Sequence, residues 1–339
     1  MGEHSVVYGR PALVAALGLY ARARASNSGG HGVRLVLDDL GHHETVAWAD
    51  LVALARATRA DWESFAAARA PFRGLDRDDP AVLVKLALGE VAAELGPPAS
   101  GLELRVTSEI PVGAGFGSSA AVAVAVLSAV LTWAGERAEP DRLERLALAV
   151  ERRQHGTPSG VDHRTVLAGG LHRYAPGAEP ALTPCPAGGL VERLALYHTG
   201  RPAESTGEVV AAVRRRRQSD PDAFDELVAR MGAGVEALAA EVASDREDAA
   251  RVTELIRGFE RALEGLGVVP APVRERIRRL EEEGAAAKIS GAGALSGSGA
   301  GGLLVYLPPE TPEPGRALAG LRRLRAPLGV QGAQCEVTA

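Results

Sequence analysis

The segment that most constrains the fold is rich in glycine and lies between a strand pattern and a helix pattern. Leu102, Leu104 and Val106 alternate with charged residues, which predicts a half-buried strand. The sequence PVGAGFGSSAA follows at 111–121, and a long Ala/Val helix then runs through Trp133. Glycines lack Cβ atoms, so successive backbone N–H groups can close around an anion, and a helix start adds unpaired N–H groups and the positive end of its dipole. The junction therefore predicts a phosphate cradle.

Three interpretations of this loop compete. A Walker A loop needs Lys followed by Ser or Thr after its last glycine, and this loop has no lysine there. A Rossmann fingerprint, as in a dehydrogenase, has GxGxxG in the first βαβ unit, whereas GxGxG occurs here far along the chain. A glycine turn with a serine cap is the purely structural interpretation, but three glycines and two serines at one strand–helix junction favour phosphate binding. Ser118 and Ser119 either cap the helix or offer a hydroxyl to a phosphate-bound Mg²⁺.

Length and composition limit the partners that such a site can have. The 339 residues favour two domains, and 46% apolar with 24% charged residues is the balance of an ordinary globular protein. The net charge of −5 disfavours non-specific nucleic-acid binding. Cys185 and Cys335 fit no metal or disulfide spacing, and the start of the sequence lacks the basic region of a signal peptide. The apolar run 120–134 is shorter than the roughly 20 residues of a membrane span, so we expect a cytoplasmic protein.

The remaining pattern predicts an α+β protein in two domains. We place the boundary in 171–190, which is rich in Pro, Gly and Ala, and so expect domains at 1–180 and 181–339. Arg214 to Arg217 are interpreted as a solvated helix face rather than a phosphate-binding patch. Apart from the loop and its flanks, the expected strands are two around a turn in 6–19 and others at 33–37, 193–200, 286–289 and 302–307, and the expected helices are 78–95, 141–154, 205–218, 221–243, 246–265 and 270–283.

Three segments together resemble the GHMP kinases, the family of galactokinase, homoserine kinase, mevalonate kinase and phosphomevalonate kinase. PVGAGFGSSAA resembles the signature loop of the family, GEHSVVYGRPAL from Gly2 its N-terminal motif, and KISGAGALSGSGAGGLLVYL from Lys288 its C-terminal motif. They occur in the order of the family and span nearly the whole chain. The last motif departs from the usual GAGGGG, since Gly291 and Gly293 match but the next three residues do not. The resemblance implies nucleotide binding by Pro111, Gly113, Ala114, Gly115, Gly117, Ser118 and Ser119.

Two carboxylates complete the site that phosphoryl transfer needs. Glu151 ends the helix 141–154, and Asp162 follows in the loop HGTPSGVD. Phosphoryl transfer requires a metal ligand and a group that orients or deprotonates the acceptor hydroxyl. The resemblance implies that Glu151 and Ser119 hold Mg²⁺ and that Asp162 is the catalytic residue. Because a carboxylate is a weak base for an alcohol, most of the catalysis is expected from positioning and charge neutralisation.

The N-terminal motif discriminates within the family. Galactokinases carry an Asp-Tyr-Asn type of segment after Gly-Glu-His, whereas mevalonate kinases carry Ala/Ser-Val-Val and then an aromatic residue or His before Gly, as here. This resemblance places Glu3, His4 and Asp162 on the substrate side, although His4 without the motif would equally be a core histidine. Thr206 in HTGRPAEST resembles a threonine near the active site. Mevalonate kinases also carry a lysine in a strand before Gly-Glu-His, so we expect the natural protein to begin upstream of Met1.

The implied fold is the two-domain α+β GHMP kinase fold, with an S5-like N-terminal domain and a ferredoxin-like C-terminal domain. The implied function is ATP-dependent phosphorylation of mevalonate to 5-phosphomevalonate in isoprenoid biosynthesis, with Mg²⁺ as cofactor. The expected partners are ATP and mevalonate, without nucleic acid or membrane, and a homodimer is left open. The alternatives are a mevalonate 3-kinase, a phosphomevalonate kinase, a diphosphomevalonate decarboxylase, or a non-catalytic nucleotide-binding relative. Retention of Glu151, Asp162 and Ser119 together argues against the last of these.

Overall fold

Contacts divide the chain into two units, neither of which is a single stretch of sequence. The computed structural model describes residues 1–76, 78–177, 180–185, 189–244, 246 and 248–337. The first unit contains Met1–Gly18, Pro111–Phe116 and Gly169–Gln331, and the second contains Leu19–Ile110, Gly117–Ala168 and Gly332–Ala339. The N-terminal residues therefore pack with the C-terminal half of the chain. The division at residue 180 stays a prediction about the domains of the family.

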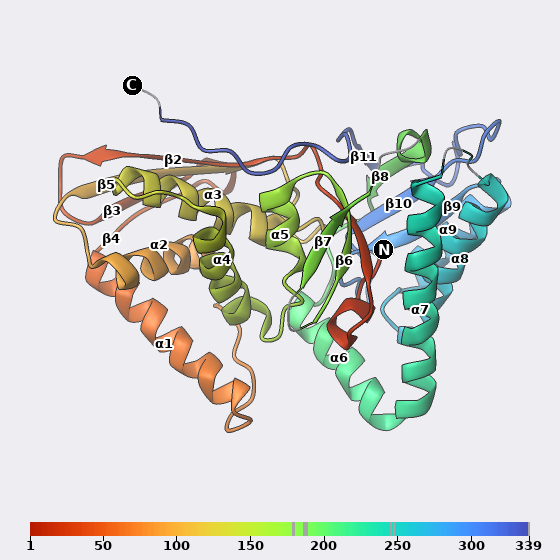
Figure 1. The fold of residues 1–339 in the computed structure, drawn as a ribbon, viewed down its shortest axis with the longest axis horizontal. Helices are drawn as coiled ribbons and strands as arrows, with labels where there is room; N and C mark the ends of the chain where they lie inside the picture. The colour runs from red at the N-terminus through yellow and green to blue at the C-terminus, as the bar shows by residue number, and fades with distance from the viewer. Residues whose placement is uncertain (77, 178–179, 186–188, 245, 247, 338–339) are drawn as a thin grey trace. The chain divides into compact units, whose positions relative to one another are not determined.

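A four-stranded sheet forms one layer of the second unit (Figure 1). Its order is β2-β5-β3-β4, with β3 and β5 parallel and the other neighbours antiparallel. Apolar side chains recur at every second position of β3 and β5 and are buried, as the period of a half-buried strand requires. The strands are β2 (Ala21–Ser28), β3 (Val33–Leu37), β4 (His42–Val46) and β5 (Gly101–Ser108), with a short 3-10 turn, η2 (Asp38–Leu40).

Helices form the second layer of this unit and bury the apolar face of the sheet (Figure 1). The core consists mainly of Ala, Val and Leu from the sheet and the first four helices, together with Trp48. The helix that follows the glycine-rich loop buries mainly Ala, Val and Leu side chains, and small side chains of this kind let neighbouring helices approach closely. The helices are α1 (Trp48–Ala66), α2 (Val82–Leu95), α3 (Ser118–Trp133), α4 (Pro140–His155) and α5 (Val161–Ala168).

The first unit contains two sheets and the four long helices of the C-terminal half. Strand β1 pairs with β6, which pairs with β7, so the N-terminal segment is tied to the middle of the chain. The second sheet has the antiparallel order β11-β8-β10-β9. The elements of the first unit are η1 (Ser5–Tyr8), β1 (Ala12–Ala15), β6 (Leu171–Ala175), β7 (Ala181–Pro184), η3 (Gly189–Arg193), β8 (Leu194–His198), α6 (Thr206–Ser219), α7 (Pro221–Val242), α8 (Ala249–Leu266), α9 (Ala271–Glu282), β9 (Ala286–Ser290), β10 (Gly302–Tyr306) and β11 (Arg322–Leu324).

Most of the expected elements are present, but the structure differs in several places and also has elements that were not predicted, among them β2, β4 and β11. The segment 6–19 was expected to form two strands, but its first part is the 3-10 turn η1 and only β1 follows as a strand. The aperiodic segment 171–190 contains the strands β6 and β7, while residues 178–179 and 186–188 lie outside the described part of the chain. Helix α1 was not predicted. Among the described residues, no helix combines the length and apolarity needed to cross a membrane.

A close approach of α1 and α2 gives a prediction about stability. A Cβ added to Gly89 of α2 would lie 2.2 Å from the carbonyl oxygen of Leu51 in α1, which is backbone and cannot move aside easily. Gly89→Ala should therefore lower the free energy of unfolding by about 1–3 kcal/mol through overpacking, although alanine is the better helix former. The measurement is urea unfolding followed by circular dichroism.

Gly258 supplies the matched control. It is exposed on α8, and an added Cβ there meets no atom within 4 Å. Gly258→Ala should raise stability by about 0.5–1 kcal/mol, because only helix propensity changes. Equal effects of the two substitutions would contradict the tight packing of α2 on α1.

Candidate active site

The glycine-rich loop follows β5 and ends where α3 begins, as predicted. Gly113, Gly115 and Gly117 all have positive φ, between 68° and 73°, which favours glycine at each position. Gly115 also packs backbone against backbone: a Cβ there would lie 2.5 Å from the Ser290 carbonyl oxygen. At Gly117 an added Cβ would meet nothing within 4 Å. Close packing within the first unit thus explains why residue 115 is a glycine. At residue 117, only the positive φ of the backbone favours glycine.

Helix α3 begins without a side-chain cap. Gly117 is its N-cap residue, with a left-handed conformation, and no side chain accepts a hydrogen bond there. Ser118 and Ser119 form the first turn and are half-buried. Of the two roles left open for these serines, a capping bond is therefore not observed. The backbone N–H groups of this first turn are of the kind that binds phosphate at a helix start.

The C-terminal motif packs on the loop from within the first unit. Gly291 approaches Gly115 so closely that a Cβ on Gly291 would lie 2.5 Å from the Gly115 Cα atom. Further along, the Gly302 N–H donates to the Ala114 carbonyl at 2.7 Å. Gly291 and Gly302, which lie on either side of the segment 294–301 in which the motif departs from GAGGGG, therefore both contact the loop that resembles a nucleotide-binding loop.

Glu151 lies in the last turn of α4 and is only 3% exposed. Its Oε2 accepts a hydrogen bond from Nδ1 of His163 at 3.1 Å, and His163 is fully buried. Its Oε1 is also buried, but finds no hydrogen-bond partner among the described residues. A buried carboxylate oxygen without a partner is costly, unless a cation binds there. The donor set therefore fits a hard divalent cation such as Mg²⁺, which prefers carboxylate and hydroxyl oxygens.

Asp162 lies on a helix and not in a loop. It was expected in HGTPSGVD, but α5 begins at Val161, so Asp162 occupies the first turn of this short helix and is exposed. A carboxylate in a first turn is favoured by the helix dipole, which stabilises its charged form. Helix α5 packs against α3 and α4 within the second unit. The structure therefore carries Ser119, Glu151 and Asp162 on three helices of one unit that contact one another.

Glu3 and His4 lie against the C-terminal motif in the first unit. Lys288 of β9 is 1% exposed, and its Nζ donates to Glu3 Oε1 at 2.5 Å and to the Ile289 carbonyl at 2.7 Å. Burial alone would raise the pKa of Glu3, but the Lys288 ammonium and its hydrogen bond outweigh it and lower that pKa to about 2. His4 Nε2 donates to the Ala292 carbonyl at 2.9 Å, and burial lowers the pKa of this imidazole.

His4 also has a backbone conformation that is rare for a residue with a side chain. Its φ is 58° and its ψ is −49°. Such strain persists where the surroundings hold the residue on several sides, and it is common at functional sites. The hydrogen bond of His4 to Ala292 and the ion pair of the preceding Glu3 hold this turn, and both contacts lie within the first unit. The substrate-side role of Glu3 and His4 stays a prediction.

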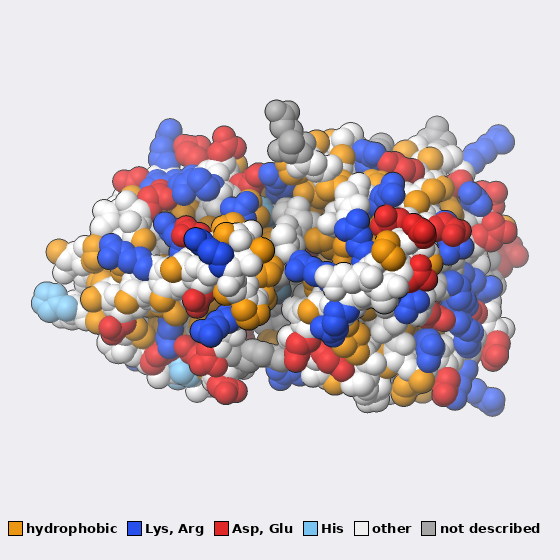
Figure 2. Space-filling model, turned by 90° about the horizontal axis from the view of Figure 1, so that it is seen from below, with side chains coloured by type: hydrophobic (Ala, Val, Ile, Leu, Met, Phe, Trp, Pro, Cys, Tyr) orange, Lys and Arg blue, Asp and Glu red, His pale blue; other side chains and the backbone are white. Residues whose placement is uncertain are grey.

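The remaining candidates are at the surface of the first unit. Thr206 is exposed and begins α6, directly after Ser205, which forms a capping box with Glu208. Arg214 to Arg217 are exposed on α6, as expected of a solvated face, and Arg217 pairs with Asp225 at 3.5 Å. Figure 2 shows Lys and Arg side chains interspersed with Asp and Glu side chains on the face that it displays. A phosphate-binding role for the four arginines therefore gains no support.

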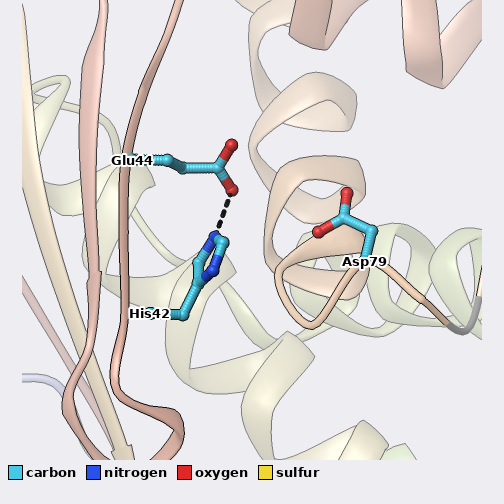
Figure 3. A group of neighbouring side chains, drawn as sticks. All are labelled: His42, Glu44 and Asp79. Carbon is cyan, nitrogen blue, oxygen red and sulfur yellow. Dashed lines mark hydrogen bonds and ion pairs between the residues drawn. The ribbon is translucent and has the colours of Figure 1, made fainter.

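One group of side chains has the spacing of a metal site. Among the described residues, only His42, Glu44 and Asp79 place three such ligand atoms close together, and Figure 3 shows them converging from β4 and the segment before α2. The Lys85 Nζ, however, lies 2.8 Å from both Glu44 and Asp79. Burial would lower the pKa of Lys85, but these hydrogen bonds outweigh it and raise that pKa. The lysine ammonium is the cation of this cluster, so we do not assign a metal to it.

Sequence reasoning missed two residues that hold the candidate site. Lys288 was noticed only as the start of a motif, although a lysine directly between Ala287 and Ile289 in a strand already signals a buried charge with a partner. His163 follows Asp162 directly and had no signal of its own, because its partner Glu151 lies on another helix. Only the packing of α5 on α4 reveals it.

Comparison with known proteins places the chain in a family. The model of the GHMP kinases N terminal domain matches residues 82–170, which include the glycine-rich loop and both carboxylates. A mevalonate kinase from Pyrococcus horikoshii is 32% identical over 317 residues, covering 91% of this chain and 85% of that protein. One from Thermococcus gammatolerans is 31% identical over 315 residues, covering 91% and 86%. The chain belongs to the GHMP kinases. It is therefore an ATP-dependent kinase of small molecules, as its motifs predicted.

The fold agrees with this assignment. The structure of the Methanococcus jannaschii mevalonate kinase matches with a TM-score of 0.72 over 96% of this chain and 94% of that one, at 18% identity. The α+β GHMP kinase fold expected from the resemblance is confirmed. At this identity the structural match concerns the fold alone.

A buried carboxyl beside β9 gives a prediction about pH. Glu260 of α8 is fully buried and accepts a hydrogen bond from the Ile289 N–H at 3.0 Å. Burial raises its pKa from 4.5 to about 8, more than the hydrogen bond and the nearby Lys288 ammonium lower it. The folded state therefore keeps a proton that the unfolded state loses above about pH 4.5, so this group lowers stability as pH rises from about 4.5 to about 8.

Glu260→Gln should remove this dependence, because the amide oxygen still accepts from Ile289 and carries no charge. Relative to the unmodified protein, the variant should gain stability between pH 5 and pH 8, by an amount on the order of a few kcal/mol. Thermal unfolding at both values measures the difference. Glu254→Gln, at an exposed position of the same helix, should show no such trend. A Glu260→Gln gain that does not grow with pH would refute the raised pKa.

Proposed function

We propose that this chain is a mevalonate kinase, which transfers the γ-phosphoryl group of ATP to the 5-hydroxyl of mevalonate. The observation that carries the proposal is the similarity to mevalonate kinases along 91% of the chain, within which Glu151 and Asp162 lie on two helices that contact each other and α3. The N-terminal segment GEHSVVYG supports the same choice of acceptor. Production of 5-phosphomevalonate also places the chain in the mevalonate pathway.

The phosphates are held by backbone groups. The loop 111–117 and the uncapped first turn of α3 offer N–H groups without the competition of a capping side chain. Ser119 and Glu151 are the residues proposed to hold Mg²⁺, since a hydroxyl and a buried carboxylate oxygen without a partner suit this ion. When bound, Mg²⁺ neutralises charge that develops on the phosphate oxygens. The protein contributes a fixed carboxylate, because His163 holds the other oxygen of Glu151.

Asp162 is proposed to orient the acceptor hydroxyl and to take its proton. Its position in the first turn of α5 keeps the carboxylate exposed while the helix beneath it is packed against α3 and α4. A rigid helix turn holds a catalytic group more closely than a loop does, and phosphoryl transfer depends chiefly on such positioning. The helical position of Asp162 therefore supports its proposed catalytic role.

The acceptor side is proposed to include the turn at Glu3 and His4 and the start of α6 at Thr206. Glu3 is neutralised by Lys288, so its charge does not oppose a carboxylate substrate as a free glutamate would. His4 is neutral near pH 7, since burial lowers its pKa. We propose that this segment contributes shape and polar groups to the acceptor side rather than net charge.

A direct assay tests the proposal. The full-length protein with ATP, Mg²⁺ and mevalonate should release ADP and form 5-phosphomevalonate, identified by phosphorus and proton NMR. Asp162→Asn should lower kcat by about 10²- to 10⁴-fold, because the group that takes the proton is lost. Asp141→Asn is the matched control, since Asp141 is likewise an exposed aspartate in the first turn of a helix, α4.

The outcome separates the alternatives. Transfer to the 3-hydroxyl, to phosphomevalonate or with loss of carbon dioxide from diphosphomevalonate would replace the proposed acceptor by one of the other pathway enzymes. Binding of ATP without turnover on any of these substrates would contradict a catalytic role. An equal loss of kcat in Asp141→Asn and Asp162→Asn would remove the special role of Asp162.

A further inference from the structure

The hydrogen bond between Glu151 and His163 connects the proposed metal ligand, Glu151, with the helix that carries the proposed catalytic residue, Asp162. Glu151 is in the last turn of α4, and His163 is in the first turn of α5, next to Asp162 in the sequence. Nδ1 of His163 lies 3.1 Å from Oε2 of Glu151, and both side chains are buried. Because a carboxylate oxygen only accepts, Nδ1 carries the proton of this bond.

Because of this hydrogen bond, the two carboxylate oxygens of Glu151 differ in their hydrogen-bond partners. Oε2 is occupied by His163, whereas Oε1 is buried without a partner among the described residues. A buried carboxylate with two free oxygens would rotate between them, and each rotation would change which oxygen is presented. With Oε2 fixed, the rotamer is fixed as well, and Oε1 is the oxygen presented to a cation. Partners of this kind orient metal ligands in many proteins.

The same bond also holds the helix that bears Asp162. Helix α5 has only eight residues, too few to be stable on its own, so its place depends on packing and on bonds to its neighbours. The side chain of His163 is fully buried and bonds to Glu151 of α4, while Asp162, one residue earlier in α5, is exposed. The buried side chain of this turn thus anchors it, and the adjacent carboxylate of Asp162 lies at the surface.

We propose that His163 is a positioning residue, which fixes the Glu151 carboxylate for Mg²⁺ and holds the turn that carries Asp162. The inference rests on the proposed function of Glu151 and Asp162, but it assigns a new role to a residue that touches neither substrate nor metal. What matters is a donor at the position of Nδ1. The ring is replaceable where another side chain supplies that donor.

Manganese binding tests this role apart from turnover. Mn²⁺ is titrated into the full-length protein with a non-hydrolysable ATP analogue, and free Mn²⁺ is measured by electron paramagnetic resonance. His163→Leu removes the donor and should raise the Kd for Mn²⁺ by about 10- to 100-fold, as loss of such a partner does elsewhere. His163→Asn places an amide N–H near the position of Nδ1 and should keep the Kd within about threefold of the unmodified protein.

Two further variants separate positioning from general damage. His163→Gln places its N–H near the position of Nε2 instead, so it should weaken Mn²⁺ binding as His163→Leu does, and it replaces the leucine variant if that one does not fold. Thr165→Val changes a buried residue of the same helix whose hydroxyl donates only within the helix, to Val161 at 2.8 Å. It should leave Mn²⁺ binding unchanged. In turnover, kcat should follow the Kd for Mn²⁺ across the set while the KM for mevalonate changes little.

The possible results distinguish this inference from the proposed function. Unchanged Mn²⁺ affinity in His163→Leu or His163→Gln, in a protein that phosphorylates mevalonate, overturns the positioning role and leaves the function in place. Affinity that follows the Nδ1 donor, in a protein that does not phosphorylate mevalonate, supports the positioning role and rejects the acceptor. Unchanged Mn²⁺ affinity in Glu151→Gln would remove the metal ligand and overturn the inference with it.

Discussion

The backbone contact between Gly115 and Gly291 is the constraint on which the first unit depends. These glycines approach so closely that a Cβ on either one would lie 2.5 Å from backbone atoms of the other's segment. No other residue type fits at such a distance, so the contact itself requires glycine at both places. The N-terminal turn joins the same assembly, because His4 bonds to Ala292 and Glu3 pairs with Lys288. Three motifs that are far apart in the sequence therefore meet within one unit.

Buried carboxylates in this protein are stabilised in different ways, and the difference identifies the proposed metal ligand. Glu3 is paired with a lysine, and Glu260 is protonated because burial raises its pKa to about 8. Glu90 lies between two arginines, at 2.9 and 3.0 Å. An oxygen without a hydrogen-bond partner is common to all four, but in the described structure Glu151 lacks the lysine or arginine partner that Glu3 and Glu90 have. Its carboxylate instead accepts the hydrogen bond from His163. Burial of charge demands compensation, so Glu151 is the carboxylate at which a further cation is expected.

The cluster of His42, Glu44 and Asp79 supports this interpretation by contrast. Its ligand atoms have the spacing of a metal site, which Glu151 with His163 lacks. The negative charge of its two carboxylates is nevertheless already balanced in part, because the Lys85 ammonium contacts both Glu44 and Asp79. Spacing alone is therefore a poor guide to cations in this chain. A carboxylate that already pairs with a lysine or arginine has no need of a metal ion, whereas a buried carboxylate without such a partner can bind one.

The sequence predicted those parts of the fold in which burial produces a regular pattern. Strand β5 and the helices α2, α3 and α4 have apolar residues at the proper period, and the structure has them nearly where they were expected. Helix α1 was missed because its fully buried positions end at Ala55, and from there to Ala66 its residues are exposed or only half-buried. Strands β6 and β7 were missed because each has at most one buried residue, so no alternation appears.

The candidate site was predictable in its residue types but not in its supports. The glycine-rich loop, Glu151 and Asp162 were found from motifs that lie in short stretches of sequence. The helical position of Asp162 was not, because α5 is brief and follows Gly156, Pro158 and Gly160, which signal a loop. His163 and Lys288 act through partners on other elements, and no local pattern records such a contact.

The C-terminal motif departs from the GAGGGG of the family in the segment 294–301, and hydrogen bonds hold this segment at both ends. At its start, the N–H of Ala294 donates to the Val268 carbonyl at 2.9 Å, and directly after it the N–H of Gly302 donates to the Ala114 carbonyl. Between these fixed ends, Glu204 accepts from the Leu295 N–H at 2.9 Å and from the Ser296 hydroxyl at 2.6 Å. The hydrogen bond from the Ser296 hydroxyl is the largest of the effects that lower the pKa of Glu204. The carboxylate is therefore charged when it accepts these two hydrogen bonds. This segment is therefore anchored along its length, and Gly291 and Gly302, which contact the glycine-rich loop, lie on either side of it.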